Sequence, residues 1–493
     1  MAMTDRPNIL WYCADQMRYD TIAALGNPHI RTPNLDQLVA GGTAFEKAYA
    51  QAPVCTPSRA SFLTGRYPAS HHVYRNGVRT FPDDEVLVTK ILADAGYDCG
   101  LVGKLHLSTA TKGESRVQDG YRFFQWSHHP MTGEADHLNA YHSWLRDEKG
   151  VCPSELFAEQ RGFVAAGVPE DLHQTTWCTE MAIRFIDEGR DGPWLLSVNP
   201  YDPHPPFDPP ADYLQRYDPN TIPPPLFRPS DLERQRMFAR VRSQTVEAVD
   251  PTGSATVDGD YKSQSERGYR PPKNFDGRAA KAAYFAMIEL IDAQLGRIIQ
   301  HLDAMRELDN TLIVFMSDHG ELLGDHGLMY KGCRFFEGLV HVPLILSGPR
   351  IQKGLRSRAL VELVDVAPTL LAMANEPIPD RMQGCALTNI LEGRASDPHD
   401  HKSTVFCDFN DSVGYSPVPD DTQATMTFDG RYKLVLYHTH DIGELFDLET
   451  DPGEFNNLFY DEIYKDLREQ LVLRHVNRFA RTLDAGVERV SNA

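Results

Sequence analysis

The sequence predicts an α/β protein with a large, mainly parallel sheet sandwiched by helices, followed by a smaller C-terminal α+β subdomain. Two patterns along the chain indicate this fold class. Short, continuous apolar runs alternate with helical patterns as far as about residue 384, which is typical of a parallel sheet covered on both faces. From residue 385 the chain changes to short strands separated by turn residues. We therefore expect a large domain over residues 1–384 and a subdomain over residues 385–493.

The strands expected in the large domain are apolar along their whole length. The first is NILWYCA at 8–14, and a helical pattern follows it at 32–42. Further runs of the same kind lie at 97–103, 194–199, 311–317 and 342–348. A long amphipathic helix is expected at 277–305. Because the apolar residues are continuous rather than alternating, both faces of each strand should be buried.

Two further regions differ from this alternation. Residues 205–275 are rich in proline, arginine, aspartate and serine, which predicts a long insertion over one end of the sheet. In the C-terminal subdomain, Asp429 and Gly430 indicate a hairpin. Strands are expected there at 404–409, 424–437 and 443–448, with a final helix at roughly 460–482.

Charge and composition argue against several classes of partner. The formal net charge of −20 disfavours nucleic acid and anionic membranes, but a local basic cluster can still hold a small anion. The N-terminus has no basic region before its apolar run, and no stretch reaches the roughly 20 apolar residues of a membrane span. The eight cysteines show no CxxC pair and no zinc spacing, which favours reduced thiols and a cytoplasmic location.

Two of the predicted strands end in acidic residues. Asp15-Gln16 follows the first strand, and Asp318-His319 follows the strand at 311–317. Ligands of open α/β sheets bind at the carboxyl ends of strands, so these residues are candidates to hold one divalent cation. The plainer interpretation is a helix cap or a solvated loop. The later Asp325-His326 is a candidate for orienting the first pair without binding the cation.

The stretch PVCTPSRASFLTGRYP at 53–68 places a lone cysteine at the start of a predicted helix. Pro57 suits the first turn, Gly65 ends the helix, and Arg59 lies one turn after Cys55 on the same side. The helix N-terminus favours an anion. Three interpretations are open. A thiolate nucleophile needs a longer spacing to the arginine, a structural buried cysteine is the plainest alternative, and a formylglycine precursor is the third.

These residues resemble a known family signature. CTPSRASFLTG is similar to the sulfatase pattern Cys-x-Pro-Ser-Arg-x-x-x-(Leu/Met)-Thr-Gly, within which the formylglycine-generating maturation enzyme reads Cys-x-Pro-x-Arg. GYDCGLVGKLHL at 96–107 resembles the second signature, with Cys99 in place of the usual Ser or Thr. Segments at 199–207, 364–371 and 446–458 are also sulfatase-like. Along nearly its full length the chain resembles a type I, arylsulfatase-like member of the alkaline phosphatase superfamily.

The resemblance implies that fold, hydrolysis of sulfate monoesters, and a formylglycine nucleophile made from Cys55. It also implies a divalent metal bound by Asp15, Asp318, His319 and residue 55, with Gln16 as a further candidate ligand. Arg59 would hold the hydrated aldehyde and balance its charge. The metal would lower the pKa of the attacking hydroxyl.

The other implied roles concern the ester itself. Lys104 and Lys331 would clamp the sulfate oxygens, and Lys331 would also contact the leaving oxygen. His204 would protonate the leaving group, and His106 would remove a proton from the hydrated aldehyde so that sulfate is expelled. Asn76 would hydrogen-bond the substrate.

The chain departs from the usual sulfatase pattern at both metal-binding motifs. Gln16 and His319 stand where many sulfatases have Asp and Asn, and both resemble the phosphonate monoester hydrolase and phosphodiesterase branch. An imidazole and fewer carboxylates favour manganese, with calcium second. Lys104 and His106 are sulfatase features, so sulfate monoesters come first. The alternative is a phosphonate monoester or phosphodiester hydrolase, and one enzyme active on both classes is also compatible with these residues.

The remaining expectations concern partners. A small anionic ester and the maturation enzyme are expected partners, and the C-terminal helix and the insertion are candidate contacts of a homo-oligomer. A non-catalytic oxyanion or metal sensor would lack the nucleophile or the metal ligands, whereas this chain has both. Four histidines without a role are expected at the surface or the pocket rim: His71, His72, His128 and His129.

Overall fold

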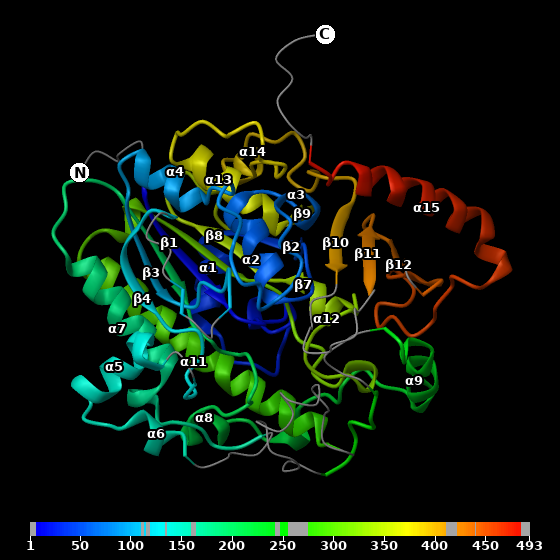
Figure 1. Cartoon of the computed structure of the whole chain (residues 1–493), viewed down its shortest axis with the longest axis horizontal. Coiled ribbons are helices and arrows are strands. Elements are labelled where there is room, and N and C mark those ends of the chain that lie inside the picture. The colour runs from blue at the N-terminus through cyan, green and yellow to red at the C-terminus, as the bar shows by residue number, and fades with distance from the viewer. Residues whose placement is uncertain are drawn as a thin grey trace, which may run out of the picture.

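The computed structural model contains a large sheet and a small sheet that lie next to each other (Figure 1). It describes residues 6–109, 113–114, 119–133, 136–158, 164–241, 247–254, 275–410, 422–438 and 440–484. The predicted fold class, an α/β protein with a C-terminal α+β part, is confirmed. The limit between domains at residues 384 and 385 stays a prediction.

The large sheet has nine strands in the order β4-β3-β5-β1-β6-β8-β2-β7, with β9 paired to β2. Its strands are β1 (Asn8–Ala14), β2 (Gly42–Tyr49), β3 (Asp98–Gly103), β4 (Tyr121–Trp126), β5 (Trp194–Asn199), β6 (Thr311–Ser317), β7 (His341–Val342), β8 (Leu344–Ser347) and β9 (Leu355–Glu362). From β4 to β6 all neighbours are parallel, whereas β8 runs antiparallel to β6 and to β2. The parallel half of the sheet therefore carries the strand ends that were predicted to hold a ligand.

Helices cover both faces of this sheet (Figure 1). Residues of α1, α7 and α11 pack on one face, and residues of α2, α4 and α13 pack on the other. β1 explains the arrangement, because Leu10 and Tyr12 belong to the first core while Ile9 and Trp11 belong to the second. The helices are α1 (Pro33–Gly41), α2 (Cys55–Thr64), α3 (Pro68–His71), α4 (Val88–Asp94), α5 (Ala140–Asp147), α6 (Pro153–Leu156), α7 (Gln174–Asp187), α8 (Ala211–Leu214), α9 (Pro229–Arg234), α11 (Gly277–Ala304), α12 (Glu337–Val340), α13 (Val366–Met373), α14 (Thr388–Leu391) and α15 (Lys465–Ala480).

The small sheet is an antiparallel meander of β10 (Val405–Asn410), β11 (Gln423–Phe428), β12 (Tyr432–Tyr437) and β13 (Ile442–Asp447). The predicted hairpin at Asp429 and Gly430 joins β11 to β12, and Gly430 takes a left-handed backbone with φ 96°. α15 lies against this sheet, and its buried His475 bonds the hydroxyls of Thr425 and Thr427 at 2.7 and 2.9 Å.

The predicted insertion at 205–275 contains the short helices α8 and α9. Its residues 242–246 and 255–274 lie outside the described part of the chain. Elsewhere the insertion bonds to the loop that follows β6: Leu226 N donates to Asp325, and Val249 N donates to Gly327 O. No helix among the described residues is long and apolar enough to span a membrane. None of the eight cysteines, all of them described, forms a disulfide.

Candidate active site

Asp15 and Asp318 meet at the carboxyl edge of the large sheet because their strands are neighbours. β1 and β6 pair in register, with Ala14 opposite Ser317, so both acidic residues leave the sheet at the same level. Ligand atoms of Asp15, Cys55, Asp318 and His319 all lie within 4.8 Å of one another, and the four residues are buried. We call these four residues the strand-end cluster.

Helix α2 brings Cys55 to this edge. Cys55 is the first residue of the helix, and Gly65 ends it in a left-handed conformation with φ 70°, as predicted. Ser58 fixes the helix against the strand end, since its hydroxyl donates to Asp318 O at 2.5 Å. Asn76 accepts a hydrogen bond from Thr56 N at 2.9 Å, so its carbonyl oxygen caps the start of the helix. The side chain of residue 55 is consequently held at a helix N-terminus, where negative charge is favoured.

The strand-end cluster has the donor set of a divalent metal site. His319 donates its Nδ1 proton to Gly320 O at 2.8 Å, so Nε2, 3.1 Å from Cys55 Sγ, is the ring atom that would bind a metal. Two carboxylates complete a group of oxygen and nitrogen donors that suits such a cation. The Gln16 amide is engaged by Lys331 and Glu321 instead.

Three buried cations surround the strand-end cluster. Lys331 Nζ lies 2.8 Å from Cys55 Sγ, and Lys104 Nζ lies 3.7 Å from the same sulfur while it pairs with Asp15. Arg59 donates from Nε to Asp318 at 2.8 Å and from Nη1 to Lys104 O at 3.0 Å. Its Nη2 has no hydrogen-bond partner among the described residues, so one donor remains for a ligand.

The pKa shifts show that this environment stabilises negative charge. Burial would raise the pKa of Asp15, but Lys104 above all holds it well below its usual range. Burial and Asp15 also act to raise the pKa of Cys55. Lys104, Lys331 and His319 outweigh them, and the pKa of the thiol falls. Residue 55 therefore sits where an anion is favoured even before a metal is considered.

Two predicted histidines lie beside the cluster in neutral form. Burial, followed by Lys331, lowers the pKa of His204 well below its usual range, and its Nδ1 donates to Pro205 O at 2.7 Å. Burial, followed by Lys104, likewise lowers the pKa of His106, whose Nδ1 has no hydrogen-bond partner among the described residues. A neutral imidazole is suited to accept a proton.

Other predicted residues lie elsewhere. Asp325 pairs with Arg18 at 2.8 Å and His326 bonds Arg234 at 2.9 Å, so neither belongs to the strand-end cluster. The expectation that His71 lies at the surface or pocket rim is wrong, because its ring is wholly buried and bonds the Ser61 hydroxyl at 3.0 Å inside the fold. His128 is half-buried and contacts His106 edge-on, with ring centroids 4.3 Å apart.

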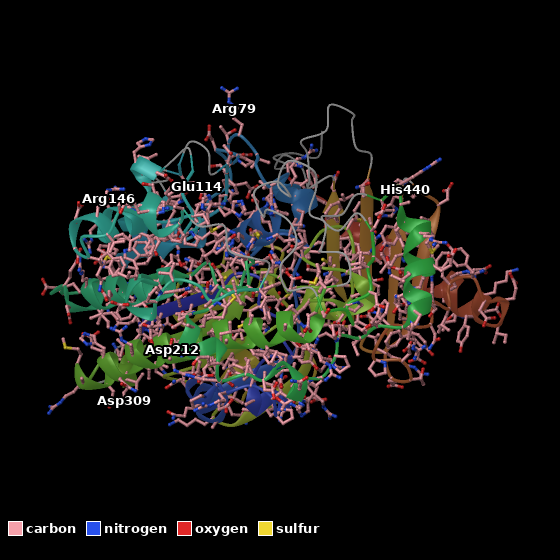
Figure 2. The ribbon with its side chains drawn as sticks, turned by 90° about the horizontal axis from the view of Figure 1, so that it is seen from below. Arg79, Glu114, Arg146, Asp212, Asp309 and His440 are labelled. Carbon is pink, nitrogen blue, oxygen red and sulfur yellow. The ribbon has the colours of Figure 1, made fainter. Side chains whose placement is uncertain are left out.

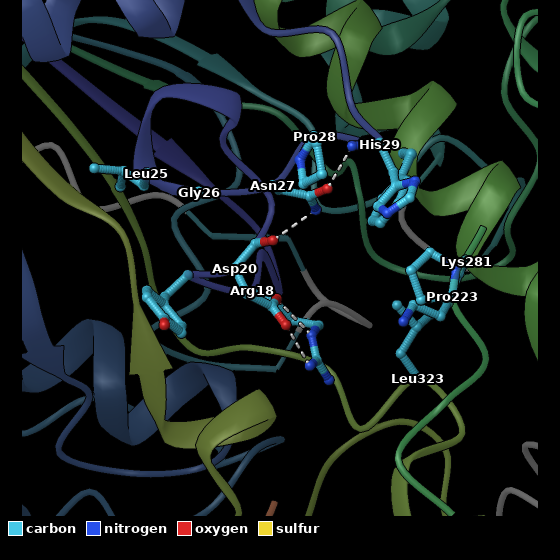
Figure 3. Close-up of a pocket in the computed structure, with 12 residues that line it drawn as sticks. Arg18, Asp20, Leu25, Gly26, Asn27, Pro28, His29, Pro223, Lys281 and Leu323 are labelled. Atoms are coloured by element: carbon cyan, nitrogen blue, oxygen red, sulfur yellow. Dashed lines mark hydrogen bonds and ion pairs between the residues drawn. The ribbon is translucent and has the colours of Figure 1, made fainter. Parts of the chain in front are cut away.

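A pocket of about 350 Å³ opens beyond the end of β1 (Figure 3). Arg18 closes on the carboxylate of Asp20 at 2.9 and 2.7 Å there, and Asn27 donates to Asp20 O at 2.7 Å. None of the residues predicted to bind metal or substrate lines this pocket. Its polar groups bind one another, and the chemistry lies at the neighbouring strand-end cluster.

Two buried carboxylates next to the site were missed from the sequence. Glu321 accepts from the Gln16 amide and from the backbone N–H of Leu323, and so holds the residue after Asp15. Glu114 accepts from the backbone N–H of His106. Both act through contacts with backbone N–H groups or a side-chain amide, which leave no periodic signal in a sequence.

Comparisons with known proteins agree with this geometry. The sequence profile of the sulfatase family matches residues 7–376, and that of the N-sulphoglucosamine sulphohydrolase C-terminal region matches residues 324–480. An arylsulfatase of Clostridium perfringens is 31% identical over 478 residues, which cover 94% of this chain and 92% of that protein. A multifunctional alkaline phosphatase superfamily protein of Trinickia caryophylli is 30% identical, covering 94% of this chain and 93% of that one.

Solved structures agree in fold. The phosphonate monoester hydrolase of Agrobacterium radiobacter superposes with a TM-score of 0.80 at 24% identity, and the match covers 99% of this chain and 98% of the other. The profile match spans most of the chain and includes the strand-end cluster, the α2 motif and all three cations. This chain is therefore a member of the sulfatase family of the alkaline phosphatase superfamily, a sulfuric ester hydrolase.

Proposed function

We propose that the protein hydrolyses sulfate monoesters, of the arylsulfatase type, with a formylglycine nucleophile at position 55. The observation that carries the proposal is the approach of two ammonium groups to one side chain. Lys331 Nζ lies 2.8 Å and Lys104 Nζ 3.7 Å from Cys55 Sγ, at the start of a helix. An oxyanion ester attacked from residue 55 would place its developing charge between these cations.

The burial of Cys55 bears on how the nucleophile is made. Cys55 and Arg59 are each 1% exposed, and Pro57 between them is buried in the same helix. An enzyme that reads Cys-x-Pro-x-Arg needs this segment extended and accessible. The maturation enzyme would therefore act before α2 folds, which makes it a transient partner of the nascent chain. A cytoplasmic location and a homo-oligomer remain predictions.

The chain's own residues divide the reaction between them. Arg59 would balance negative charge at residue 55, and Lys104 and Lys331 would bind the sulfate oxygens. His204 would donate a proton to the leaving oxygen. Its pKa is low in the free protein, and the negative charge of a bound ester beside it would oppose that shift. His106, neutral and adjacent, would accept a proton from the nucleophile.

The strand-end cluster would hold one divalent cation, which supplies Lewis acidity to the ester oxygens when bound. Manganese is our first choice, because the donors combine two carboxylates with one imidazole. Calcium, which prefers hard oxygen donors, comes second. Metal analysis of the purified protein that finds only calcium would overturn the preference.

Mass spectrometry and kinetics together test the proposal. The mass of the peptide that carries residue 55 is measured after expression with a maturation enzyme, and kcat/KM is measured with 4-nitrophenyl sulfate. We expect formylglycine or its hydrate at position 55, and activity that rises with the modified fraction. Full activity from quantitatively unmodified protein would contradict the proposed nucleophile.

The second candidate is a phosphonate monoester or phosphodiester hydrolase with the same nucleophile. Gln16 and His319 favour it, since both replace residues that are usual in sulfatases, and a relative at 30% identity is named multifunctional. Esters of both classes carry one negative charge, and the two candidates differ in the group that is attacked: a sulfate monoester presents three non-bridging oxygens, whereas a phosphonate monoester or a phosphodiester presents two. A large preference for the 4-nitrophenyl ester of phenylphosphonate over 4-nitrophenyl sulfate, at matched conditions, would reverse our ranking.

A further inference from the structure

Glu114 lies beside the site, and in its contacts with the described residues it only accepts hydrogen bonds. Its carboxylate accepts from the backbone N–H groups of His106, Leu107 and Ser108 at 2.6, 2.5 and 2.8 Å. The indole N–H of Trp126 adds a fourth bond at 3.2 Å. Glu114 is 5% exposed, so these donors replace the water that a carboxylate would otherwise bind. In the view of Figure 2 Glu114 lies within the outline of the molecule, whereas Arg79 projects from its edge.

The backbone that Glu114 binds is strained at His106. His106 has φ 57°, a left-handed conformation that a non-glycine side chain seldom adopts unless its surroundings impose it. The chain on its N-terminal side is fixed by the sheet, since Lys104 N donates to Asn199 O at 2.9 Å. On its C-terminal side, the Glu114 carboxylate binds the backbone of three successive residues.

The imidazole of His106 depends on this backbone for its direction. Its Nδ1 has no hydrogen-bond partner among the described residues, so none of them orients the ring through that atom. Among the described residues, the ring contacts His128 edge-on, with 4.3 Å between the ring centroids. His128 follows β4 two residues after Trp126, whose indole is also bound by Glu114. One carboxylate thus binds the backbone of His106 and the side chain of Trp126, two residues before His128.

The contacts require an ionised acid at position 114. Four donors point at two oxygens, which leaves no acceptor for a proton on either one. Burial raises the pKa of Glu114, and the N–H donors oppose that effect. A glutamine would present an NH₂ group to some of the same N–H donors, although its shape is nearly the same. The site is therefore sensitive to chemistry at position 114, and not only to volume.

We propose that Glu114 is a positioning residue for His106, which it holds in the orientation needed to accept the proton from the nucleophile at residue 55. The proposal rests on the proposed function for its consequence in catalysis, and on the contacts above for its structural part. Groups that orient a reacting side chain in this way typically contribute 10- to 100-fold to activity.

The test is Glu114→Gln in the matured, metal-loaded full chain, with two measurements. With 4-nitrophenyl sulfate we expect kcat to fall about 10- to 100-fold while KM changes little. In hydrogen–deuterium exchange, uptake should rise in the segment 104–109, because its amides lose their acceptor. Asp292→Asn is the matched control: Asp292 accepts from Asn34 N and Leu35 N at the start of α1, and its loss should leave kcat and the uptake of 104–109 unchanged.

A double mutant separates positioning from general damage. In a His106→Ala background, Glu114→Gln should cost little further activity, because the ring that it positions is gone. An equal loss in both backgrounds, or unchanged uptake in 104–109, would overturn the proposal. If the glutamine variant does not fold, Glu114→Asp replaces it under the same criteria, since it keeps the charge and withdraws both oxygens by one methylene. A wild-type protein inactive on every ester would refute the proposed function, while the exchange measurement would still decide whether Glu114 holds His106.

Discussion

Two clusters of buried charged residues in this molecule differ in their ratio of cations to carboxylates. At the active site, three cations, Arg59, Lys104 and Lys331, surround the two carboxylates of the strand-end cluster, Asp15 and Asp318. At the junction with the small sheet, a second group has as many cations as carboxylates. We call this group the anchor network; it consists of Glu362, Asp365, Lys402 and Arg478.

The charged groups of the anchor network are paired with one another. Lys402 Nζ lies 2.6 Å from both carboxylates, and Arg478 of α15 lies 2.9 Å from Glu362. Tyr67 donates to Glu362 at 2.6 Å. The active site, by contrast, retains a cation in excess and an Arg59 donor without a partner among the described residues. Buried charges that satisfy one another join parts of a fold, whereas an excess of one sign is left for a ligand.

The largest effect should come from the nucleophile. Cys55→Ser removes the precursor, and we expect kcat to fall by about 10⁴-fold or more, since the residual activity would rest on binding and electrostatics alone. Cys407→Ala, in the buried strand β10, is the control that should keep its activity. Comparable losses of kcat in the two variants would show that the effect lies in folding, and would contradict a catalytic role for Cys55.

Matched lysine variants test the comparison directly. Lys331→Ala should lower kcat/KM about 10²- to 10³-fold without loss of thermal stability, because it relieves an excess of positive charge. Lys402→Ala should instead destabilise the fold by about 3–5 kcal/mol, because it leaves the buried Asp365 without its lysine and Glu362 with Arg478 alone. Thermal melts and steady-state kinetics on both variants check this. A stability loss in Lys331→Ala as large as that in Lys402→Ala would erase the distinction between the clusters.

The metal provides a third test. His319→Ala should weaken binding of a divalent cation by about 10²-fold, since one of four buried donors is lost. His401, whose ring lies 3.5 Å from Asp365 in the anchor network, is the control histidine. Metal content per chain after dialysis against a chelator should fall in His319→Ala and not in His401→Ala. Equal metal content in both variants would show that the cation binds outside the strand-end cluster.

The smallest effect concerns the pH dependence of stability. Burial, with His438 beside it, lowers the pKa of His475 to about 3, against 6.5 in the unfolded chain. As pH falls from 7 towards 4, the unfolded chain binds a proton at His475 that the folded chain does not bind. The free energy of unfolding therefore falls by up to about 1.4 kcal/mol per pH unit. His475→Gln should flatten this slope, and His137→Gln, at an exposed position, should not. Denaturant unfolding at several pH values measures both, and an unchanged slope in His475→Gln would contradict the assignment.

The sequence predicted the elements whose apolar residues are continuous. β1 and β6 carry such runs, α11 has an amphipathic pattern, and the α2 motif contains its own start and stop. Three strands were not predicted: β2, β4 and β9. β4 is an edge strand with the exposed Arg122, and β9 carries the exposed Arg356. Strands with one solvent-exposed face lack the continuous run of apolar residues that identified the buried strands.

The candidate site was predictable to the extent that its residues stand in motifs. Asp15 and Asp318 follow recognisable strands, and Lys104 and His106 lie in a segment similar to a family signature. Glu114 and the Arg59 donor without a partner were not predictable, because their roles depend on which backbone and side-chain groups the fold brings within 3.5 Å. The anchor network was missed for the same reason: it joins residues from distant parts of the chain.

The burial of α2 has a consequence for any preparation of this enzyme. Cys55, Pro57 and Arg59 are sealed into the core as the helix forms. If residue 55 is converted as proposed, a molecule that folds before it is modified would not be converted afterwards without unfolding. Folding and maturation would then compete in each newly made chain, and the outcome would not change later. The specific activity of a batch would then record the ratio of maturation enzyme to newly made chains, and later incubation would not raise it.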